Sequence, residues 1–332
     1  SESTIRIWNY DDFIKKDVKM SDIADEMTII QPDSIDYKGA RIVHASSFFL
    51  AGTEQGILKY NNQGHFIGRI GAIGQGPGEY SRFYAMAINE TERIIYVYRM
   101  NTSELLSFSY EGTFLNKHSL QLPKKWAWSF YYLKDKFYFY YCVDADNESQ
   151  PYMYAITDTM GNLLSSKRDE SLHFASGSYP SFPSDHLGIY GDTMLVWSQY
   201  SDTIYRVSEK EEEAFAIWGE WDKRLTPAKV ENDAYEQSMI ISTIVETVHY
   251  YLCIWRPAGI MWNQWNYCFY DKSSGKLFNS EGITDDLWGL PSIFPYNYYV
   301  MDGREYLECG YPTYKLLDAW LTSDDPKITK AS

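Results

Sequence analysis

The sequence contains no uninterrupted apolar run of about 18 residues, so no segment is long enough to cross a membrane as a helix. It also lacks clusters of lysine and arginine. Its 45 acidic residues against 30 basic ones give a formal net charge of −15. Contacts with phosphate groups need clustered basic side chains. We therefore expect no nucleic-acid partner and no direct binding to an anionic membrane.

Cysteine is scarce, and the four cysteines show no C-x-x-C pair and no histidine at the spacing of a metal site. Cys253 and Cys268 flank a loop almost symmetrically, which predicts that they face each other across a hairpin. Two buried thiols and a disulfide are both compatible with that placement.

The familiar catalytic motifs are missing as well. There is no G-x-S-x-G and no G-x-x-x-x-G-K-[ST], and the six histidines form no H-E-x-x-H or H-x-H pair. Local motifs therefore predict no catalytic residue, no metal and no cofactor. In a closed ring of strands, however, distant residues meet at the axis. His44 and His249 fall in segments expected to be innermost, where they would either approach a channel or pack between strands.

Aromatic residues are abundant, at 17% of the chain with 30 tyrosines and 11 tryptophans, which is typical of broad β-sheet surfaces. The sequence also repeats a unit of short apolar strands. The turn glycines Gly64, Gly112 and Gly161 recur at intervals of about 48 residues, the period of a four-stranded propeller blade.

The repeat predicts an all-β fold, a six-bladed β-propeller of four-stranded blades that forms one domain over residues 1–332. Five blades are expected at 41–71, 83–120, 128–169, 186–219 and 241–283. The last blade would combine strands from both termini, with closing strands in 1–34, further strands in 291–321 and a C-terminal helix, because a closed ring removes exposed sheet edges. A seven-bladed ring, with a degenerate blade in 220–239, is the alternative.

Between the first two units lies a loop rich in glycine and proline, formed by Gly74, Gly76, Pro77, Gly78 and Glu79. Such a stretch cannot be the interior of a helix or strand, so we predict a structured turn between blades. Glu79 would either contact a ligand or hold the loop in place.

Two stretches carry a family resemblance. Residues 74–120 resemble an NHL-type repeat. The segment from Ser21 to Glu26, together with the Gly-Gln-Gly-Pro-Gly-Glu-Tyr motif at 74–80, looks like the six-bladed propeller lipoproteins of Bacteroides-type bacteria. The resemblance implies a binding role in the cell envelope, as a periplasmic or outer-membrane lipoprotein. The signal and the anchor cysteine would be absent from this chain, and a lipid anchor would be the only link to the membrane.

In a propeller, one face carries the loops between blades and the loops that join the second and third strands of each blade. Flat rings beside arginines on that face are suited to stacking on sugars or gripping a peptide. We therefore predict a non-catalytic propeller that binds a glycan or a protein partner at the cell surface; the alternatives are rings that only pack between blades, and a lyase or hydrolase with an axial metal or carboxylate site. The candidate ligand-binding residues are Arg82, Arg99, Trp126, Tyr200, Arg256, Trp262, Trp265 and Trp288.

Overall fold

The computed structural model describes residues 6–9, 12–33, 41–141, 152–169, 186–218, 223–259, 265–287, 289, 295–301 and 303–309. Over these residues the chain is almost entirely β, with two short helices, α1 (Met20–Ile23) and α2 (Pro227–Glu231). Thr226 caps α2 by accepting a hydrogen bond from the backbone N–H of Lys229, and Pro227 is its first residue, which suits proline because that position needs no N–H donor.

The first three sheets each consist of four consecutive antiparallel strands. The first sheet contains β4 (Arg41–Ala45), β5 (Phe48–Thr53), β6 (Gly56–Asn61) and β7 (Phe66–Ile70). The second contains β10 (Tyr84–Asn89), β11 (Ile94–Arg99), β12 (Glu104–Ser109) and β13 (Phe114–Ser119). The third contains β14 (Ser129–Leu133), β15 (Lys136–Tyr140), β16 (Tyr152–Asp158) and β17 (Leu163–Arg168). The short strands β8 (Ala72–Ile73) and β9 (Glu79–Tyr80) pair in the loop between the first two sheets.

The fourth and fifth sheets have the same core of four antiparallel strands but carry additional parallel strands. The fourth contains β19 (Ile189–Tyr190), β20 (Thr193–Val196), β21 (Thr203–Val207) and β22 (Glu212–Trp218). The fifth contains β23 (Met239–Glu246), β24 (Tyr250–Pro257), β25 (Asn266–Asp271) and β26 (Lys276–Ser280). β18 (His186–Leu187) pairs in parallel with β23.

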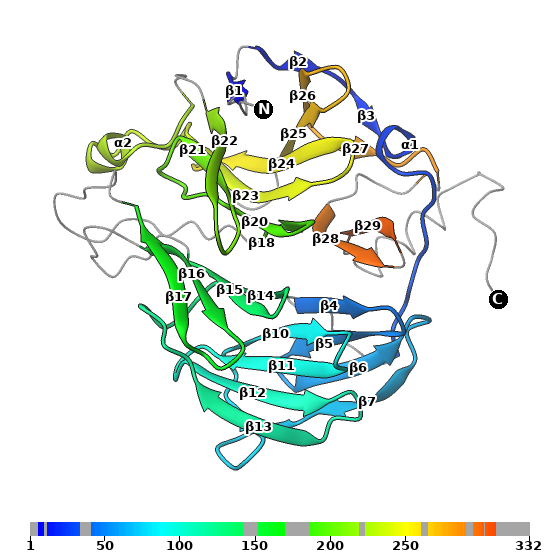
Figure 1. Cartoon of the computed structure of the whole chain (residues 1–332). Coiled ribbons are helices and arrows are strands. Elements are labelled where there is room, and N and C mark those ends of the chain that lie inside the picture. The colour runs from blue at the N-terminus through cyan, green and yellow to red at the C-terminus, as the bar shows by residue number, and fades with distance from the viewer. Residues whose placement is uncertain are drawn as a thin grey trace.

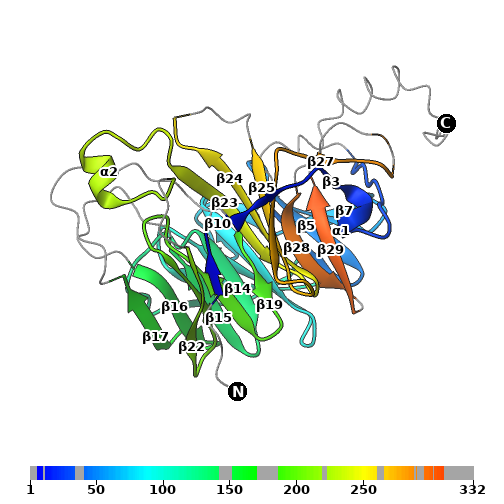
Figure 2. The same ribbon diagram turned by 90° about the horizontal axis from the view of Figure 1, so that it is seen from above.

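The N-terminal segment, residues 6–9 and 12–33, lies along the outside of the molecule, and we call it the strap. Its β1 (Arg6–Trp8) pairs in parallel with β22, and its β2 (Ile14–Lys15) pairs in parallel with β26. Its β3 (Val18–Lys19) pairs with β27 (Ile283–Thr284). Figure 1 shows the strap in dark blue running past β26 to β3 and its own short helix α1, and Figure 2 shows it crossing from beside β22 to α1.

A hairpin of β28 (Pro295–Met301) and β29 (Arg304–Cys309) occupies the position between the fifth and first sheets (Figure 1). β28 contacts both β23 and β4, the first strands of those sheets, just as β10 contacts β4 and β14. The sheets therefore follow one another around a ring with their first strands innermost. This arrangement is a β-propeller.

Two details of the predicted ring differ from the structure. Five sheets have four propeller strands, whereas β28–β29 is two-stranded over the described residues, so six complete blades are not observed. The described N-terminal strands pair with β22, β26 and β27 rather than with β28 or β29. Residues 223–238 contain α2 and turns, with no additional blade. The predicted C-terminal helix lies outside the described residues.

The repeated turn glycines have a common structural role. Gly64, Gly112 and Gly161 have φ values of 90°, 85° and 89°, where side chains with a Cβ are strained. A Cβ at Gly112 would also lie 2.6 Å from the carbonyl oxygen of Arg69, at the end of β7, and one at Gly161 would lie 2.6 Å from that of Ser119, at the end of β13. Each glycine therefore allows one blade to pack closely on the preceding one.

Gly64 makes the same contact with the strap. A Cβ at Gly64 would lie 2.8 Å from the carbonyl oxygen of Gln31. The N–H of Asp33 donates to the carbonyl of Gly64 at 2.9 Å, as the N–H of Gln121 donates to that of Gly161 at 2.8 Å. Residues 31–33 therefore occupy the same position relative to the first sheet as the end of β7 occupies relative to the second sheet and the end of β13 relative to the third.

Candidate binding face

The glycine-rich loop between the first two sheets is closed by its own hydrogen bonds. Gly74 N–H donates to the carbonyl of Tyr80 at 3.0 Å, and the Glu79 N–H donates to that of Gly76 at 3.1 Å. The Glu79 carboxylate in turn accepts from Gly76 N–H at 2.7 Å, so it holds the loop in place. Gly78 has a φ of 73°, which favours glycine at that position.

Tyr80 anchors this loop to the first sheet. Its hydroxyl donates to the carbonyl of Ile70 at 2.7 Å and accepts from the N–H of Ile57 at 2.9 Å. Burial raises the pKa of Tyr80 to about 12, so the phenol stays protonated and can keep both hydrogen bonds. The end of the loop, where the chain enters β10, is thereby fixed relative to the first sheet.

Phe83 and Trp126 form an exposed aromatic pair on the face that carries the loops between blades; we call this pair the ledge. The two rings meet edge to face, with centroids 5.0 Å apart and planes at 63°. The exposed fractions of Phe83 and Trp126 are 57% and 47%. An exposed aromatic pair of this size is suited to contact with a ligand.

The backbone of one residue, Met100 in the loop after β11, positions the ledge. Met100 N–H donates to the carbonyl of Phe83 at 3.1 Å, and the carbonyl of Met100 accepts from the N–H of Trp126 at 3.2 Å. Trp126 has a φ of 63°, an uncommon conformation for a bulky side chain. The hydroxyl of Tyr141 donates to the carbonyl of Lys124 at 3.0 Å and fixes the loop before it. Trp126 is one of the ligand-binding residues predicted from the sequence. Phe83 is not, because it was predicted to begin a strand.

Two of the other candidate residues are inside the molecule. Arg99 is buried and forms a salt bridge with Glu104 at 2.7 Å. Tyr200 is buried in a small cluster with Leu225 and Ile240. Both side chains contribute to packing rather than to an accessible surface. Arg82, by contrast, is exposed next to Phe83.

Arg256, near the end of β24, and Trp265, immediately before β25, form a second pair on the same face. The guanidinium carbon of Arg256 lies 5.9 Å from the centre of the Trp265 ring, within the range of a cation–π contact. Partial burial lowers the pKa of Arg256. Trp265 is half-buried against the core beneath the fifth sheet. Trp262 and Trp288 lie outside the described residues.

Charged residues on the inner strands are already paired. The Glu246 carboxylate, 3% exposed at the end of β23, accepts from Arg206 of the fourth sheet at 2.6 Å and from Lys272 at 2.9 Å. His44 of β4 stacks on Tyr299 with ring centroids 3.7 Å apart, and its Nε2 lies 3.2 Å from the Glu308 carboxylate.

His44 therefore packs between the first sheet and the β28–β29 hairpin, and His249 lies in the turn after β23. Among the residues that the structure describes, no three or more histidine, cysteine or acidic side chains are grouped so as to hold a metal ion. The inner-strand groups that are described thus connect neighbouring blades.

Cys253 and Cys268 are directly opposite each other on β24 and β25, where the sequence placed them. Both are free thiols, and both are buried. Burial raises the pKa of each thiol, so both stay protonated and unreactive at neutral pH. They act as small hydrophobic side chains of the core.

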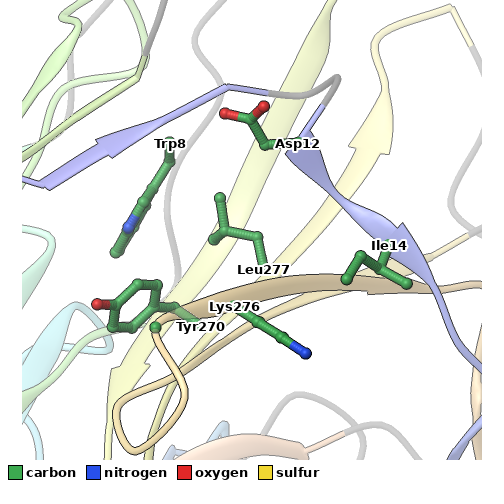
Figure 3. Close-up of a pocket in the computed structure, with 7 residues that line it drawn as sticks. Trp8, Asp12, Ile14, Tyr270, Lys276 and Leu277 are labelled. Atoms are coloured by element: carbon green, nitrogen blue, oxygen red, sulfur yellow. The ribbon is translucent and has the colours of Figure 1, made fainter.

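A hollow of about 430 Å³ opens where the strap crosses the fifth sheet (Figure 3). Trp8, Asp12 and Ile14 of the strap line one side, and Tyr270, Lys276 and Leu277 line the other. The lining residues of the fifth sheet flank the turn between β25 and β26, at the opposite end of the sheet from Arg256. This hollow is therefore separate from the ledge.

None of the described helices combines the length and the hydropathy that a membrane crossing requires. The chain matches, over residues 6–332, the model of a domain of unknown function, DUF4934. The chain therefore belongs to the DUF4934 family. No curated protein matches it.

Among solved structures, the chain is similar to an exported protein of Bacteroides fragilis, with 16% identity and a TM-score of 0.65 over 95% of this chain and 90% of that one. A DUF4221-family member from Bacteroides vulgatus matches with 12% identity and a TM-score of 0.49, over 81% and 86% of the two chains. The extracellular domain of a one-component system from B. thetaiotaomicron matches with 10% identity and a TM-score of 0.44, over 81% and 31%. The first of these likenesses supports the fold.

Proposed function

We propose that this protein is a non-catalytic binding propeller of the bacterial cell envelope that takes a glycan on its loop face. The observation that carries the proposal is the ledge: two large exposed rings, Phe83 and Trp126, are held next to each other by hydrogen bonds between their backbones and that of Met100. Rings presented in this way can stack on the C–H face of a sugar without a change of conformation. Arg256 and Trp265 would extend the same surface.

The pairing of the inner charged groups supports a binding role over an axial enzyme. Glu246 is engaged by Arg206 and Lys272, and Glu308 by His44 and Asn297. A catalytic acid or base needs a carboxylate that is directed at a substrate. These carboxylates are directed at neighbouring blades.

Two finer features belong to the same proposal. The ring would have six blades, the sixth built from β28, β29 and strap residues 31–33, because those strap residues contact Gly64 as a preceding blade would. The protein would be an exported lipoprotein with NHL-like repeats, in line with its resemblance to Bacteroides propeller lipoproteins and its similarity to an exported protein of that genus.

A glycan array probed with the wild-type chain and with Trp126→Ala tests the proposed function. We expect the wild type to bind at least one glycan and the variant to lose most of that binding, because half of the stacking surface is removed. Phe66→Ala is the matched control, since Phe66 is similarly exposed but lies on the outer strand β7. An array without any bound glycan, or equal binding by wild type and Trp126→Ala, would contradict the proposal.

A further inference from the structure

The ledge lies in a locally basic part of an acidic protein. The two loops that carry it, 71–83 and 120–128, and the turn at 100–103 between them contain the basic residues Arg82, Lys124 and Lys125 and a single acidic residue, Glu79. Over the whole chain the balance is reversed, with 45 acidic and 30 basic residues. Arg82 immediately precedes Phe83, and Lys125 immediately precedes Trp126.

The acidic groups near the ledge are already engaged. The Glu79 carboxylate accepts from the N–H of Gly76 inside its own loop. Glu104, at the start of β12, is paired with Arg99 at 2.7 Å and with Lys117 at 3.0 Å. Neither carboxylate is therefore available to balance the cations beside the ledge.

The cations beside the two rings are uncommitted. Arg82 and Lys125 are exposed, and neither forms a salt bridge with any residue that the structure describes. Other basic side chains of the protein are paired, as Lys134 is with Asp192 and Lys167 with Glu212. Although the chain carries an excess of carboxylates, Arg82 and Lys125 thus have no ion-pair partner among the described residues, and each is next to an exposed ring in the sequence.

We propose that the ledge binds an acidic polysaccharide, with sugar rings on Phe83 and Trp126 and carboxylate or sulfate groups paired with Arg82 and Lys125. A pyranose offers an apolar C–H face to an aromatic ring and carries a charged substituent at its edge, where flanking cations can reach it. Arginine and lysine form strong, charge-assisted hydrogen bonds with such groups. This inference rests on the proposed function, because it specifies the glycan that the loop face takes.

The test measures binding of the full chain to four soluble polymers: polygalacturonate, its neutral methyl ester, dextran sulfate and polyglutamate. We expect polygalacturonate or dextran sulfate to bind, and the one that binds identifies the anionic group. Binding should weaken with rising salt, because the contacts are exposed ion pairs. The methyl ester and polyglutamate should bind much more weakly, since the first lacks the charge and the second lacks the sugar rings.

The variant Arg82→Gln/Lys125→Gln should weaken binding of the acidic polysaccharide by about tenfold for each cation removed. The matched control is Lys210→Gln/Lys276→Gln, which removes two exposed cations elsewhere and should bind like the wild type. Circular dichroism and the unfolding midpoint should be unchanged for both variants.

The outcomes separate this inference from the proposed function. If the array shows a neutral glycan whose binding needs Trp126 but neither acidic polysaccharide binds, the inference is wrong and the proposed function stands. Equal binding of polyglutamate, or an unchanged affinity in Arg82→Gln/Lys125→Gln, would also overturn the inference. If no glycan of any kind binds, the proposed function itself is wrong.

Discussion

The first three sheets and the fourth and fifth sheets differ at their outer edges. The strap adds β1 to the edge of the fourth sheet and β2 to the edge of the fifth. Over the described residues, no further strand pairs with β7, β13 or β17, the outer strands of the first three sheets. Within the described residues, the fourth and fifth sheets therefore have covered outer edges and the first three sheets have bare ones.

The side chains follow the same division. The bare outer strands each begin with two exposed apolar residues: Phe66 and Ile67, Phe114 and Leu115, and Leu163 and Leu164. On the covered side, Leu277 of β26 is buried, and Trp8 of the strap inserts between Phe215 and Tyr270. The strap thus forms part of the core of the fourth and fifth sheets, whereas the outer strands of the first three sheets present their apolar residues to solvent.

The largest predicted effect comes from Trp8→Ala. Trp8 is 3% exposed and packs against Phe215, Tyr251 and Tyr270, so its removal leaves a cavity between two sheets. We expect the free energy of unfolding to fall by about 3 kcal/mol. Urea denaturation measures it.

Trp126→Ala is the matched control for that measurement. It makes the same chemical change at a ring that is 47% exposed, and we expect it to change the free energy of unfolding by less than about 1 kcal/mol. Equal losses in the two variants would mean that the strap is not part of the core.

A smaller effect is expected from two carboxylates that each lie between two cations. Glu246 joins the fourth and fifth sheets through Arg206 and Lys272. Glu104 joins strands of the second sheet only, through Arg99 and Lys117. Glu246→Gln should lower the free energy of unfolding by about 2 kcal/mol, because two partly buried cations lose their partner.

Glu104→Gln should lower the free energy of unfolding by about 1 kcal/mol, because Glu104 and Lys117 are more exposed to solvent than Glu246 and its partners. Chemical denaturation of both variants at low and high salt compares them. A larger loss for Glu104→Gln would contradict the expectation that a buried carboxylate joining two sheets contributes more stability than a partly exposed one within a single sheet.

Turn glycines give a finer comparison. Gly112 has a φ of 85°, and a Cβ there would lie 2.6 Å from the carbonyl oxygen of Arg69 in the preceding blade. Gly275, in the corresponding turn of the fifth sheet, has a φ of 68°, and a Cβ there would meet only the Tyr270 hydroxyl at 3.8 Å. Backbone strain alone should lower the free energy of unfolding of Gly275→Ala by about 1 kcal/mol. Gly112→Ala should lose about 2 kcal/mol beyond that strain, because its Cβ also meets the carbonyl oxygen of Arg69.

Thermal unfolding of these two variants provides the measurement. Equal shifts in the midpoint would indicate that the close contact between blades relaxes without cost and that backbone strain alone selects glycine in these turns.

The smallest effect is expected on the bare edges. Phe114→Ser and Leu164→Ser replace exposed side chains on β13 and β17, so each should change the free energy of unfolding by only about 0.5 kcal/mol. Light scattering of concentrated samples measures self-association of wild type and variants. A loss of stability comparable to that of Trp8→Ala would show that these edges are covered in solution.

The candidate site could be predicted in part. Trp126 was recognisable because a tryptophan follows a turn between two strand patterns, and propeller topology assigns such turns to one face. Phe83 was not predicted as a binding residue, because an apolar residue directly before a strand has the sequence pattern of the strand itself. Arg99 was misjudged because a basic residue at a strand end looks exposed, whereas Glu104 draws it into a buried pair.

The sequence by itself determined the repeat and its turns, because the φ values at Gly64, Gly112 and Gly161 and the alternation of apolar residues are local requirements. It also determined that Cys253 and Cys268 face each other, since hairpin register follows from the turn between two strands. Only the tertiary structure decided where the strap lies, because strands of two or three residues can pair with any open edge. It also decided that Phe83 and Trp126 meet, because Met100, whose backbone bonds to both, is remote from Trp126 in sequence and adjacent to it only in the folded chain.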